Sequence, residues 1–559
     1  MRNTGRSSLV VPFVAALALI ACGSDDPPLG TTLDLTSAID EQGNLVEAPG
    51  EPYTVRTELA QAQSGREDSR RSLVLFHQLS DFRILDEESP LRSEWLEACA
   101  STTAAGAFRP QESLSVQAAE ALIGQANAIR RSPVTDAAVD FAIHTGNATD
   151  NAQFNELRWF IDLMDGVPID PESGAVGYQG VQTESPAEAY GDLLKLAQQA
   201  FIPQGLRYPW YAVAGNRDVL NQGTFPVSER SNAIAVGAQK IIALGPDATE
   251  NACSTDAALL PGPSADLLND PETVIRGVGS DGNRRLLTLP EWLREHLISH
   301  AAAGPGPGGH GLTAEAADAG RAYYSFDEGP TSFIVLNSAN PSGFPSGSID
   351  SAQFAWLEEQ LIARSSHYTD AAGEAVGTAN ADRLIVVVSH HPTAVMTNPY
   401  PAPDGSETLL GEQVEALLHR FPNVILHVAG HTGRNSASAR PSATGGGYWE
   451  VTTSSSLDYP MQGRLIEVVD NRDGTLSIFT TMYGAAVTLN PGDAEDPTPE
   501  DGLNQRLLAA VARQVAFRDP QLDPTGIGLA ASDRNSELLI PAPFDLTAAP
   551  LPTENRLPD

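Results

Sequence analysis

The sequence has very little lysine. Only two of its 34 basic residues are lysines, Lys195 and Lys240, whereas 71 residues are acidic, so the formal net charge is −37. A chain with this charge is repelled by nucleic acid and by anionic membrane surfaces, and no nucleic-acid partner is expected. The simplest explanation of the acidity is a solvated surface outside the cytoplasm. A calcium-rich surface is the alternative, but no spacing typical of an EF-hand supports it.

The apolar stretch near the N-terminus is short. Residues 9–20 follow two arginines and have the length of the hydrophobic part of a signal peptide, too short to span a bilayer comfortably. The stretch leads into LIAC, which resembles a bacterial lipobox. This resemblance makes residues 1–22 a lipoprotein signal peptide and Cys22 the lipidated first residue of the mature chain; an ordinary cleaved signal peptide is the alternative. Gly23 is not the aspartate associated with inner-membrane retention. We therefore expect a lipid-anchored cell-envelope protein, with the outer membrane favoured, that faces the periplasm or exterior.

Cysteine is scarce as well. Besides Cys22, the chain has only Cys99 and Cys253. In an oxidising compartment these two could form a disulfide that closes a long loop, but the sequence leaves pairing open. Neither cysteine lies in a recognisable catalytic setting, and no G-x-S-x-G motif is present. Hydrolysis by a serine or cysteine nucleophile is therefore disfavoured.

The chain divides into regions of different composition. Hydrophobic residues make up 41%, as in ordinary globular proteins. Residues 23–70 are rich in Pro, Gly, Asp and Glu and are expected to form a flexible tether. Residues 71–485 have the pattern of one folded domain, interrupted by an insertion or cap at 219–320. Residues 486–559 are Pro-rich, contain one helical segment and are expected to be a C-terminal extension.

Short apolar runs alternate with helical patterns through the central region. Each run is rich in β-branched or aromatic residues, has the length of a strand and ends in a polar loop. Between them, residues 350–364 have the spacing of an amphipathic helix, with Asp350 or Ser351 as N-cap. Residues 463–482 alternate around Asp473–Gly474, which predicts a hairpin. The fold class is therefore α/β, and the site is expected at the strand ends. The runs cover residues 73–81, 138–147, 208–216, 331–339, 383–392 and 423–431.

Five of these strand-end loops carry clusters of polar residues. They read SDFR (80–83), GNATD (146–150), GNRD (215–218), SHHP (389–392) and GHTG (430–433). Their order and placement over residues 70–485 resemble the calcineurin-like metallophosphoesterases, and the neighbouring text resembles a long secreted bacterial subgroup. That family has the blocks D-x-H, G-D-x-x-D, G-N-H-[DE], a lone His and G-H-x-H. The resemblance implies a two-sheet α/β/β/α sandwich and two divalent metals that activate water for attack on a phosphoester.

The residues at the first metal position depart from the family pattern. The resemblance assigns this metal to Asp81, Arg83, Asn147 and Gly433. Arginine stays protonated and has no lone pair to donate, and glycine has no side chain. Arg217 stands in the place of the family's catalytic histidine, and a guanidinium is a poor proton donor near neutral pH. We expect the first metal site to be lost.

The second metal position is better preserved. The resemblance assigns it to Asn147, Asn216, His390 and His431, which are two amides and two imidazoles without an anionic ligand. We expect at most one weakly bound divalent metal (Mn, Fe or Zn). His391, His77, His144 and His427 could compensate, although each is also explained as a core residue.

Three arginines follow these strands: Arg83, Arg217 and Arg434. Gathered in one pocket, they would form a metal-free site for an anion or phosphate. Alternatively, each would pair with a remaining carboxylate (Asp81, Asp150 or Asp218) and hold the loops, which the cost of unpaired buried carboxylates favours.

Two functions remain open. One is a non-catalytic protein, or a derivative that binds an anion or a phosphate-containing small molecule. The other is a phosphomonoester or phosphodiester hydrolase that uses a single metal.

Overall fold

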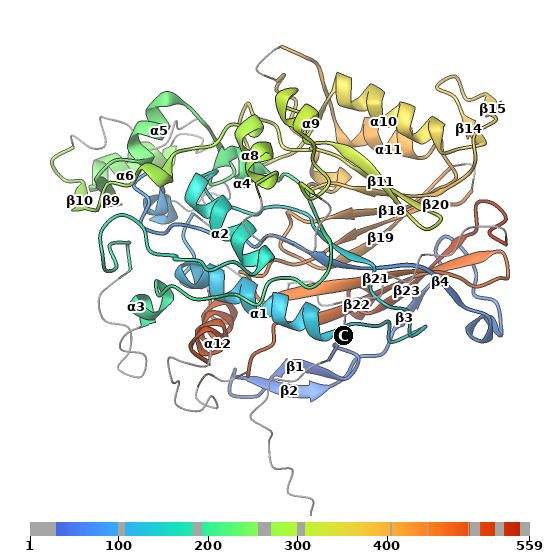
Figure 1. Cartoon of the computed structure of the whole chain (residues 1–559), viewed down its shortest axis with the longest axis horizontal. Helices are drawn as coiled ribbons and strands as arrows, with labels where there is room; N and C mark the ends of the chain where they lie inside the picture. The colour runs from blue at the N-terminus through green and yellow to red at the C-terminus, as the bar shows by residue number, and fades with distance from the viewer. Residues whose placement is uncertain are drawn as a thin grey trace, which may run out of the picture.

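Two large β-sheets pack face to face, and helices cover their outer faces (Figure 1). The structure, a computed structural model, describes residues 30–98, 107–182, 193–254, 270–298, 308–402, 405–443, 445–489, 491, 503–519 and 530–547. The seven-stranded sheet has the order β3(Thr54–Arg56), β23(Ser536–Pro541), β22(Thr475–Gly484), β21(Gln462–Asp470), β4(Arg71–Leu79), β5(Phe141–His144) and β6(Trp210–Ala212). The six-stranded sheet has the order β11(Tyr324–Glu328), β12(Thr331–Val335), β16(Leu384–Val388), β18(Val424–Ala429), β20(Gly447–Thr452) and β19(Ser436–Pro441).

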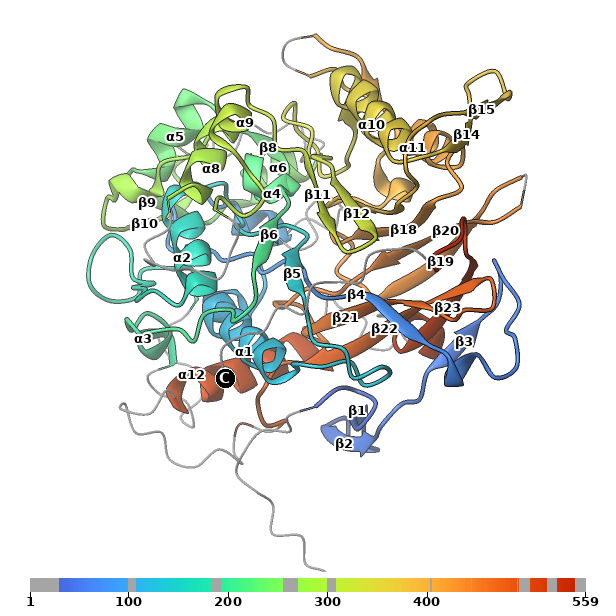
Figure 2. The ribbon, with the colours of Figure 1, turned by 45° about the vertical axis from the view of Figure 1, so that its right-hand side comes forward.

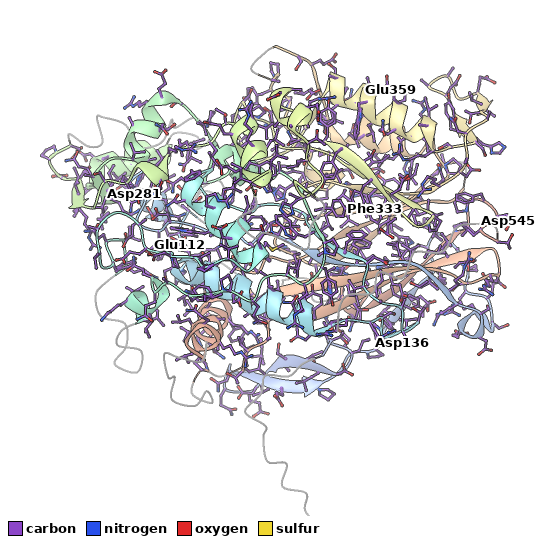
Figure 3. All side chains as sticks on the ribbon, in the orientation of Figure 1. Glu112, Asp136, Asp281, Phe333, Glu359 and Asp545 are labelled. Atoms are coloured by element: carbon purple, nitrogen blue, oxygen red, sulfur yellow. The ribbon has the colours of Figure 1, made fainter. Side chains whose placement is uncertain are left out.

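Aromatic side chains fill the space between the sheets. Phe76 and Phe141 of the seven-stranded sheet stack at 5.1 Å, and Phe333 of the six-stranded sheet meets Phe141 edge-on at 5.1 Å. Such pairs add about 0.5–1.5 kcal/mol each to the effect of burial. Figure 3 shows Phe333 among packed side chains near the centre, whereas Glu359 lies at the margin on a helix. Strands β12, β16 and β18 are buried along their whole length, which explains their continuous apolar runs.

Helices complete the outer layers. Helices α10(Ser351–Ala363) and α11(Gly411–Leu418) pack on the six-stranded sheet, and α1(Ser115–Ala128) and α2(Phe154–Asp165) pack on the seven-stranded sheet. Helix α12(Leu503–Phe517) lies against α1. Asp350 caps α10 by accepting a 2.8 Å hydrogen bond from the backbone of Gln353. The predicted two-sheet α/β sandwich is confirmed.

The cap lies beside α2 at the upper left of Figure 2, and its helices α8 and α9 lie on the side of α2 that is nearer to α10. None of its described strands joins either large sheet. The core residues Trp292 and Leu293 of the cap pack into the cluster around α1 and α2. The cap comprises α4(Asn216–Val219), β7(Leu220–Asn221), β8(Phe225–Pro226), α5(Glu229–Ala235), β9(Gln239–Ala243), α6(Pro246–Ser254), β10(Val274–Gly277), α8(Leu289–His296) and α9(Ala314–Asp318).

The expected tether and C-terminal extension both contribute to the fold, which corrects the sequence-based expectation. Within residues 30–70, β1(Leu35–Ile39) and β2(Leu45–Pro49) form a hairpin, and β3 joins the seven-stranded sheet by pairing with β23. Strand β23 belongs to the C-terminal region and also pairs with β22. Because β3 has only three residues and lies at the sheet edge, its stability comes from pairing with distant residues rather than from a local pattern.

The described residues leave some expectations open. Residues 1–22, with Cys22, and also Cys99 lie outside the described residues, and so does the side chain of Cys253. In the described parts of the chain, no helix is long and apolar enough to cross a membrane. Short two-stranded ribbons and one short helix complete the described elements: β13(Ile349–Asp350) with β17(Thr408–Leu409), β14(His367–Thr369) with β15(Ala375–Gly377), and α3(Leu193–Ala197).

Candidate functional site

The five polar loops converge where β4, β5, β6, β16 and β18 end. The Asp81 N–H donates to Gly146 O at 2.8 Å, and the Gly430 N–H donates to His390 O at 2.9 Å, so neighbouring loops are joined by backbone hydrogen bonds. The close approach also requires glycine. A Cβ on Gly215 would lie 2.2 Å from Asn147 Oδ1, and one on Gly430 would lie 2.1 Å from Ser80 Oγ.

Asp81 is fully buried and surrounded by hydrogen-bond donors. Its Oδ1 accepts from Arg83 Nε at 3.2 Å and from Asn147 Nδ2 at 3.1 Å, and its Oδ2 accepts from Ser80 Oγ at 2.8 Å and from the His431 backbone at 2.9 Å. Burial by itself raises the pKa of Asp81, but Arg83 and the neighbouring groups hold this pKa below its usual range. The Asp81 carboxylate is therefore charged, and each of its oxygens already accepts hydrogen bonds.

The Arg83 guanidinium connects Asp81 with a second carboxylate. Arg83 Nη2 lies 3.2 Å from Asp81 Oδ1, and Nη1 lies 3.3 Å from Asp458 Oδ2. A Cβ on Gly433 would lie 3.6 Å from the same Asp458 oxygen, so Gly433 faces this ion pair. Asp458 also accepts from Arg109 Nε at 2.6 Å. A protonated guanidinium supplies positive charge here but no lone pair, so the residues at the first-metal position do not fit a metal ion.

Asn147 and Arg217 belong to the same charged framework. Asn147 Oδ1 accepts a 2.7 Å hydrogen bond from the Arg217 backbone N–H, so this amide oxygen already has a donor. The Arg217 side chain forms an ion pair with Asp150, whose other oxygen lies 2.5 Å from Arg92 Nη1. Burial raises the pKa of Asp150, but Arg217 and Arg92 outweigh it and lower the pKa to about 2. Of the two expected roles for Arg83 and Arg217, pairing with residual carboxylates matches these contacts.

Asp218 does not take part in this pairing. It accepts backbone hydrogen bonds from Gly215 at 2.8 Å, Thr149 at 2.9 Å and Ala148 at 3.0 Å. Burial raises the pKa of Asp218 to about 6 despite these donors. Its carboxylate fixes the two loops that carry Asn147 and Asn216 relative to one another.

Two imidazole nitrogens and an amide oxygen lie close together at the ends of the loops that carry Asn216, His390 and His431. His390 Nε2 lies 3.0 Å from Asn216 Oδ1 and 3.2 Å from His431 Nδ1. We call these three atoms the acceptor triangle. His390 Nδ1 must donate to Thr145 O at 2.9 Å, which leaves the lone pair of neutral His390 on Nε2. Asn216 Nδ2 donates to Gly223 O at 2.8 Å, which turns Oδ1 toward His390.

A divalent cation fits the acceptor triangle. Imidazole nitrogen and amide oxygen are ligand types that Mn, Fe or Zn accept, and the three atoms lie close enough to be shared by one ion, with separations of 3.0 and 3.2 Å. Burial lowers the pKa of His390, and it lowers that of His431 to about 3, so both imidazoles are neutral ligands. One proton shared between the imidazoles would satisfy His390 Nε2 but would still leave Asn216 Oδ1 facing it. A bound metal would polarise a phosphoester oxygen or a water molecule here.

The remaining strand-end histidines already have partners inside the protein. His391 Nε2 donates to Pro345 O at 3.0 Å and its Nδ1 contacts Ser338 Oγ at 2.8 Å, so His391 has no ring nitrogen left for a metal despite its closeness to His431. His427 lies between Ser389 Oγ and Glu450. His77 contacts Ile129 O, and His144 packs on Phe82. These contacts fit the core role that was one of the two expectations.

Arg434 lies apart from the buried arginines. Its side chain is exposed and has no ion pair within the described residues, and it lines a separate cavity of about 380 Å³. The expectation that Arg83, Arg217 and Arg434 gather in one pocket is therefore wrong. The guanidiniums of Arg83 and Arg217 are drawn inward by buried carboxylates, whereas Arg434 follows a loop that turns outward.

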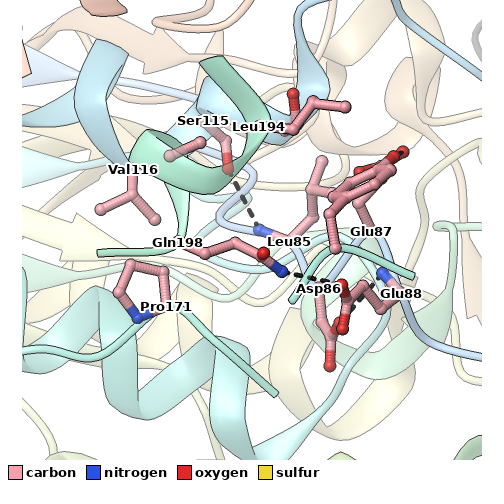
Figure 4. A pocket seen from close by; sticks show the side chains of 12 residues that line it. Leu85, Asp86, Glu87, Glu88, Ser115, Val116, Pro171, Leu194 and Gln198 are labelled. Atoms are coloured by element: carbon pink, nitrogen blue, oxygen red, sulfur yellow. Dashed lines mark hydrogen bonds between the residues drawn. The ribbon is translucent and has the colours of Figure 1, made fainter. Parts of the chain in front are cut away.

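An acidic loop after Arg83 supports this charged framework. Arg92 is almost fully buried and contacts Glu94, Glu112 and Asp150 at 3.0, 2.8 and 2.5 Å. A cavity of about 30 Å³ beside the loop is lined by Asp86, Glu87 and Glu88 (Figure 4). The other Glu94 contact, with Lys240 at 2.7 Å, ties the cap to this loop.

The sequence did not indicate that Asp458 and Arg92 belong to the site. Asp458 follows β20, and the apolar residues of β20 could have predicted one more strand with a polar loop after it. No motif includes it, and its contact with Arg83 joins residues far apart in the chain. Arg92 lies in an irregular segment, where nothing in the local pattern indicates burial.

Comparison with known proteins gives distant structural matches. Neither the protein families nor the curated proteins searched contain a match to the sequence. A dimetal phosphatase from Danio rerio is similar at 11% identity and a TM-score of 0.32, over 74% of this chain and 96% of that one. A purple acid phosphatase from yellow lupin (Lupinus luteus) seeds is similar at 10% identity and a TM-score of 0.27, over 79% of this chain and 56% of that one. Both matches are distant, and the two-sheet α/β sandwich itself is shown by the strand orders of the two large sheets.

Proposed function

We propose that this protein uses a metallophosphoesterase-like fold to bind a phosphate-containing or other anionic ligand, without two-metal hydrolysis. The observation that carries the proposal is the Arg83 guanidinium between Asp81 and Asp458. It supplies positive charge where the family's first metal would lie. A cation placed there would have to displace a buried, doubly paired arginine, which leaves an unpaired charge at a cost of several kcal/mol.

The same framework weakens proton donation to a leaving group. Arg217 stands in the slot of the catalytic histidine and is paired with Asp150. Burial lowers the pKa of Arg217 to about 10, which still leaves it protonated and a poor acid at neutral pH. Hydrolysis would therefore lack both the first metal and an efficient general acid.

Turnover with added metals tests this proposal. The purified protein is incubated separately with Mn²⁺, Fe²⁺ and Zn²⁺ and assayed with an aryl phosphomonoester and an aryl phosphodiester. We expect no turnover above that of a His390→Ala/His431→Ala variant, which removes two corners of the acceptor triangle. Brisk turnover that the double variant abolishes would overturn the proposal.

The acceptor triangle favours a second candidate, a hydrolase with one metal. Its separations of 3.0 and 3.2 Å suit the edges of a single coordination sphere. In that case His390, His431 and Asn216 would hold the metal and Arg217 would orient a phosphoryl oxygen. One tightly bound equivalent together with turnover would select this candidate.

We further propose that the protein is lipid-anchored in the cell envelope through Cys22. The support is the LIAC sequence at the end of a signal-like stretch. Processing should be blocked by globomycin, and Cys22→Ser should release the protein from the membrane fraction. Globomycin-insensitive processing, or a Cys22→Ser protein that stays membrane-bound, would refute the anchor.

A further inference from the structure

A second cavity, of about 380 Å³, lies beside the loops that carry His390 and His431. Pro392 and Thr432, which follow these histidines closely in the chain, both line it. Its volume falls in the range of about 300–1,000 Å³ that is typical of small-molecule sites. We call it the Arg434 cavity; its lining residues are Pro392, Ala394, Val395, Thr432, Arg434, Asn435, Ser436, Ser438, Arg440, Glu450, Thr452 and Asp533.

Arg434 offers this cavity a guanidinium that has no ion pair in the described parts of the chain, and Asp533 is the acidic residue of the lining besides Glu450. The Arg434 side chain is exposed. Arg440, the other arginine of the lining, is paired with Glu450 at 2.5 Å. Glu450 also contacts His427 at 3.0 Å and accepts a hydrogen bond from Thr393 Oγ1 at 2.7 Å. The Asp533 carboxylate accepts from the Ala437 backbone N–H at 3.1 Å. Both carboxylates of the lining thus have donors within the protein, and the exposed Arg434 side chain can offer its guanidinium to an anion.

The rest of the lining suits an anion that carries an organic group. Thr452 Oγ1 donates to Arg434 O at 2.9 Å and lies 2.7 Å from Ser436 Oγ, so Ser436 donates to Thr452 and keeps lone pairs free. Ala394 and Val395 add apolar side chains to the lining. A mixed lining of this kind orients a small ligand through its polar end.

The wall of the cavity is rigidly supported. Glu450 connects through His427 to Ser389 Oγ, which lies 2.8 Å from His427 Nε2 and donates to His391 O at 2.7 Å. Ser389, His427 and Glu450 are all buried. Because these groups are already ordered, ligand binding there would cost little conformational entropy.

We propose that the Arg434 cavity binds a small organic oxyanion, with Arg434 as the group that pairs with its phosphate or carboxylate. The inference rests on the proposed binding function and moves its ligand away from the buried centre. Arg83 and Arg217 are each neutralised by carboxylates there, whereas Arg434 is free to form a charge-assisted hydrogen bond.

Calorimetry with three probes tests the proposal. Phenylphosphonate, which cannot be hydrolysed as an ester, and benzoate present the two oxyanions on the same ring, and benzyl alcohol is the neutral control. We expect one equivalent of phenylphosphonate or benzoate to bind, weaker at high salt, and no binding of benzyl alcohol. The stronger of the two anions identifies the preferred oxyanion. Absence of binding by both anions would overturn the proposal.

Two variants locate the site. Arg434→Gln should weaken anion binding about tenfold or more, because it removes a charge-assisted hydrogen bond. Arg131→Gln changes another exposed arginine, one that does not line the cavity, and should leave binding unchanged. Equal affinity in Arg434→Gln and the parent would overturn the inference. Neither variant touches the acceptor triangle, so a failure of the non-hydrolytic proposal would appear in the turnover assay alone.

Discussion

The two halves of the central site, the surroundings of Asp81 and the acceptor triangle, differ in how their polar groups are compensated. Around Asp81, buried negative charge is balanced by the Arg83 guanidinium, and each carboxylate oxygen has a donor. At the acceptor triangle, an amide oxygen and an imidazole nitrogen lie 3.0 Å apart, and the two imidazole nitrogens lie 3.2 Å apart. The first half is complete without a metal, and the second gains from one.

We propose that this contrast reflects a metal centre of which one half is lost while the scaffold remains. A guanidinium can replace the charge of a cation, but it cannot activate water as a Lewis acid. Asp81 and Asp150 hold the loops by ion pairing with Arg83 and Arg217. The neutral half keeps its geometry because Thr145 and Gly223 fix the orientations of His390 and Asn216.

The largest expected effect comes from removing the guanidinium. Arg83→Met should lower the free energy of unfolding by about 3–5 kcal/mol, because it leaves buried carboxylates uncompensated. Urea unfolding of the variant and the parent measures this difference. Arg131→Met is the matched control: its ion pair with Asp136 is largely exposed and should contribute less than about 1 kcal/mol. Equal, small losses of unfolding free energy in both variants would contradict the claim that Arg83 compensates buried carboxylates.

A smaller effect is expected from adding negative charge next to the acceptor triangle. Asn147→Asp should raise the affinity of the single cation about tenfold, since an anionic ligand offsets the charge of the dication. Asp81 Oδ1 lies 3.1 Å from Asn147 Nδ2, so the new carboxylate should also destabilise the metal-free protein. Thermal unfolding with and without Zn²⁺ tests both effects. A variant less stable than the parent at every Zn²⁺ concentration would count against the cation site.

The smallest effect concerns pH. Burial raises the pKa of Glu87 to about 7, against the partly opposing effects of Tyr178 and Lys240. Because the folded state holds this proton more tightly than the unfolded state, the stabilising contribution is present below about pH 4.5 and is lost as the pH rises toward 7. Glu87→Gln should therefore reduce the loss of Tm between pH 5 and 8 by a few degrees. An unchanged pH profile would contradict this assignment.

Sequence reasoning predicted the fold and the convergence of the five loops. It worked because each strand is a continuous apolar run that ends in a polar loop. It did not predict β3, whose three residues are stabilised by pairing with β23. It missed Asp458, since a contact with Arg83 across the fold leaves no local pattern. The placement of Arg434 was wrong because the direction of a loop beyond a strand depends on tertiary packing.

Metal stoichiometry tests the central difference between the two halves most directly. The parent and the His390→Ala/His431→Ala variant are dialysed against Zn²⁺ and Mn²⁺, and bound metal is counted by elemental analysis. The account predicts at most one equivalent in the parent, held at the acceptor triangle, and none in the double alanine variant. Two equivalents in the parent, or one that survives loss of both histidines, would contradict it.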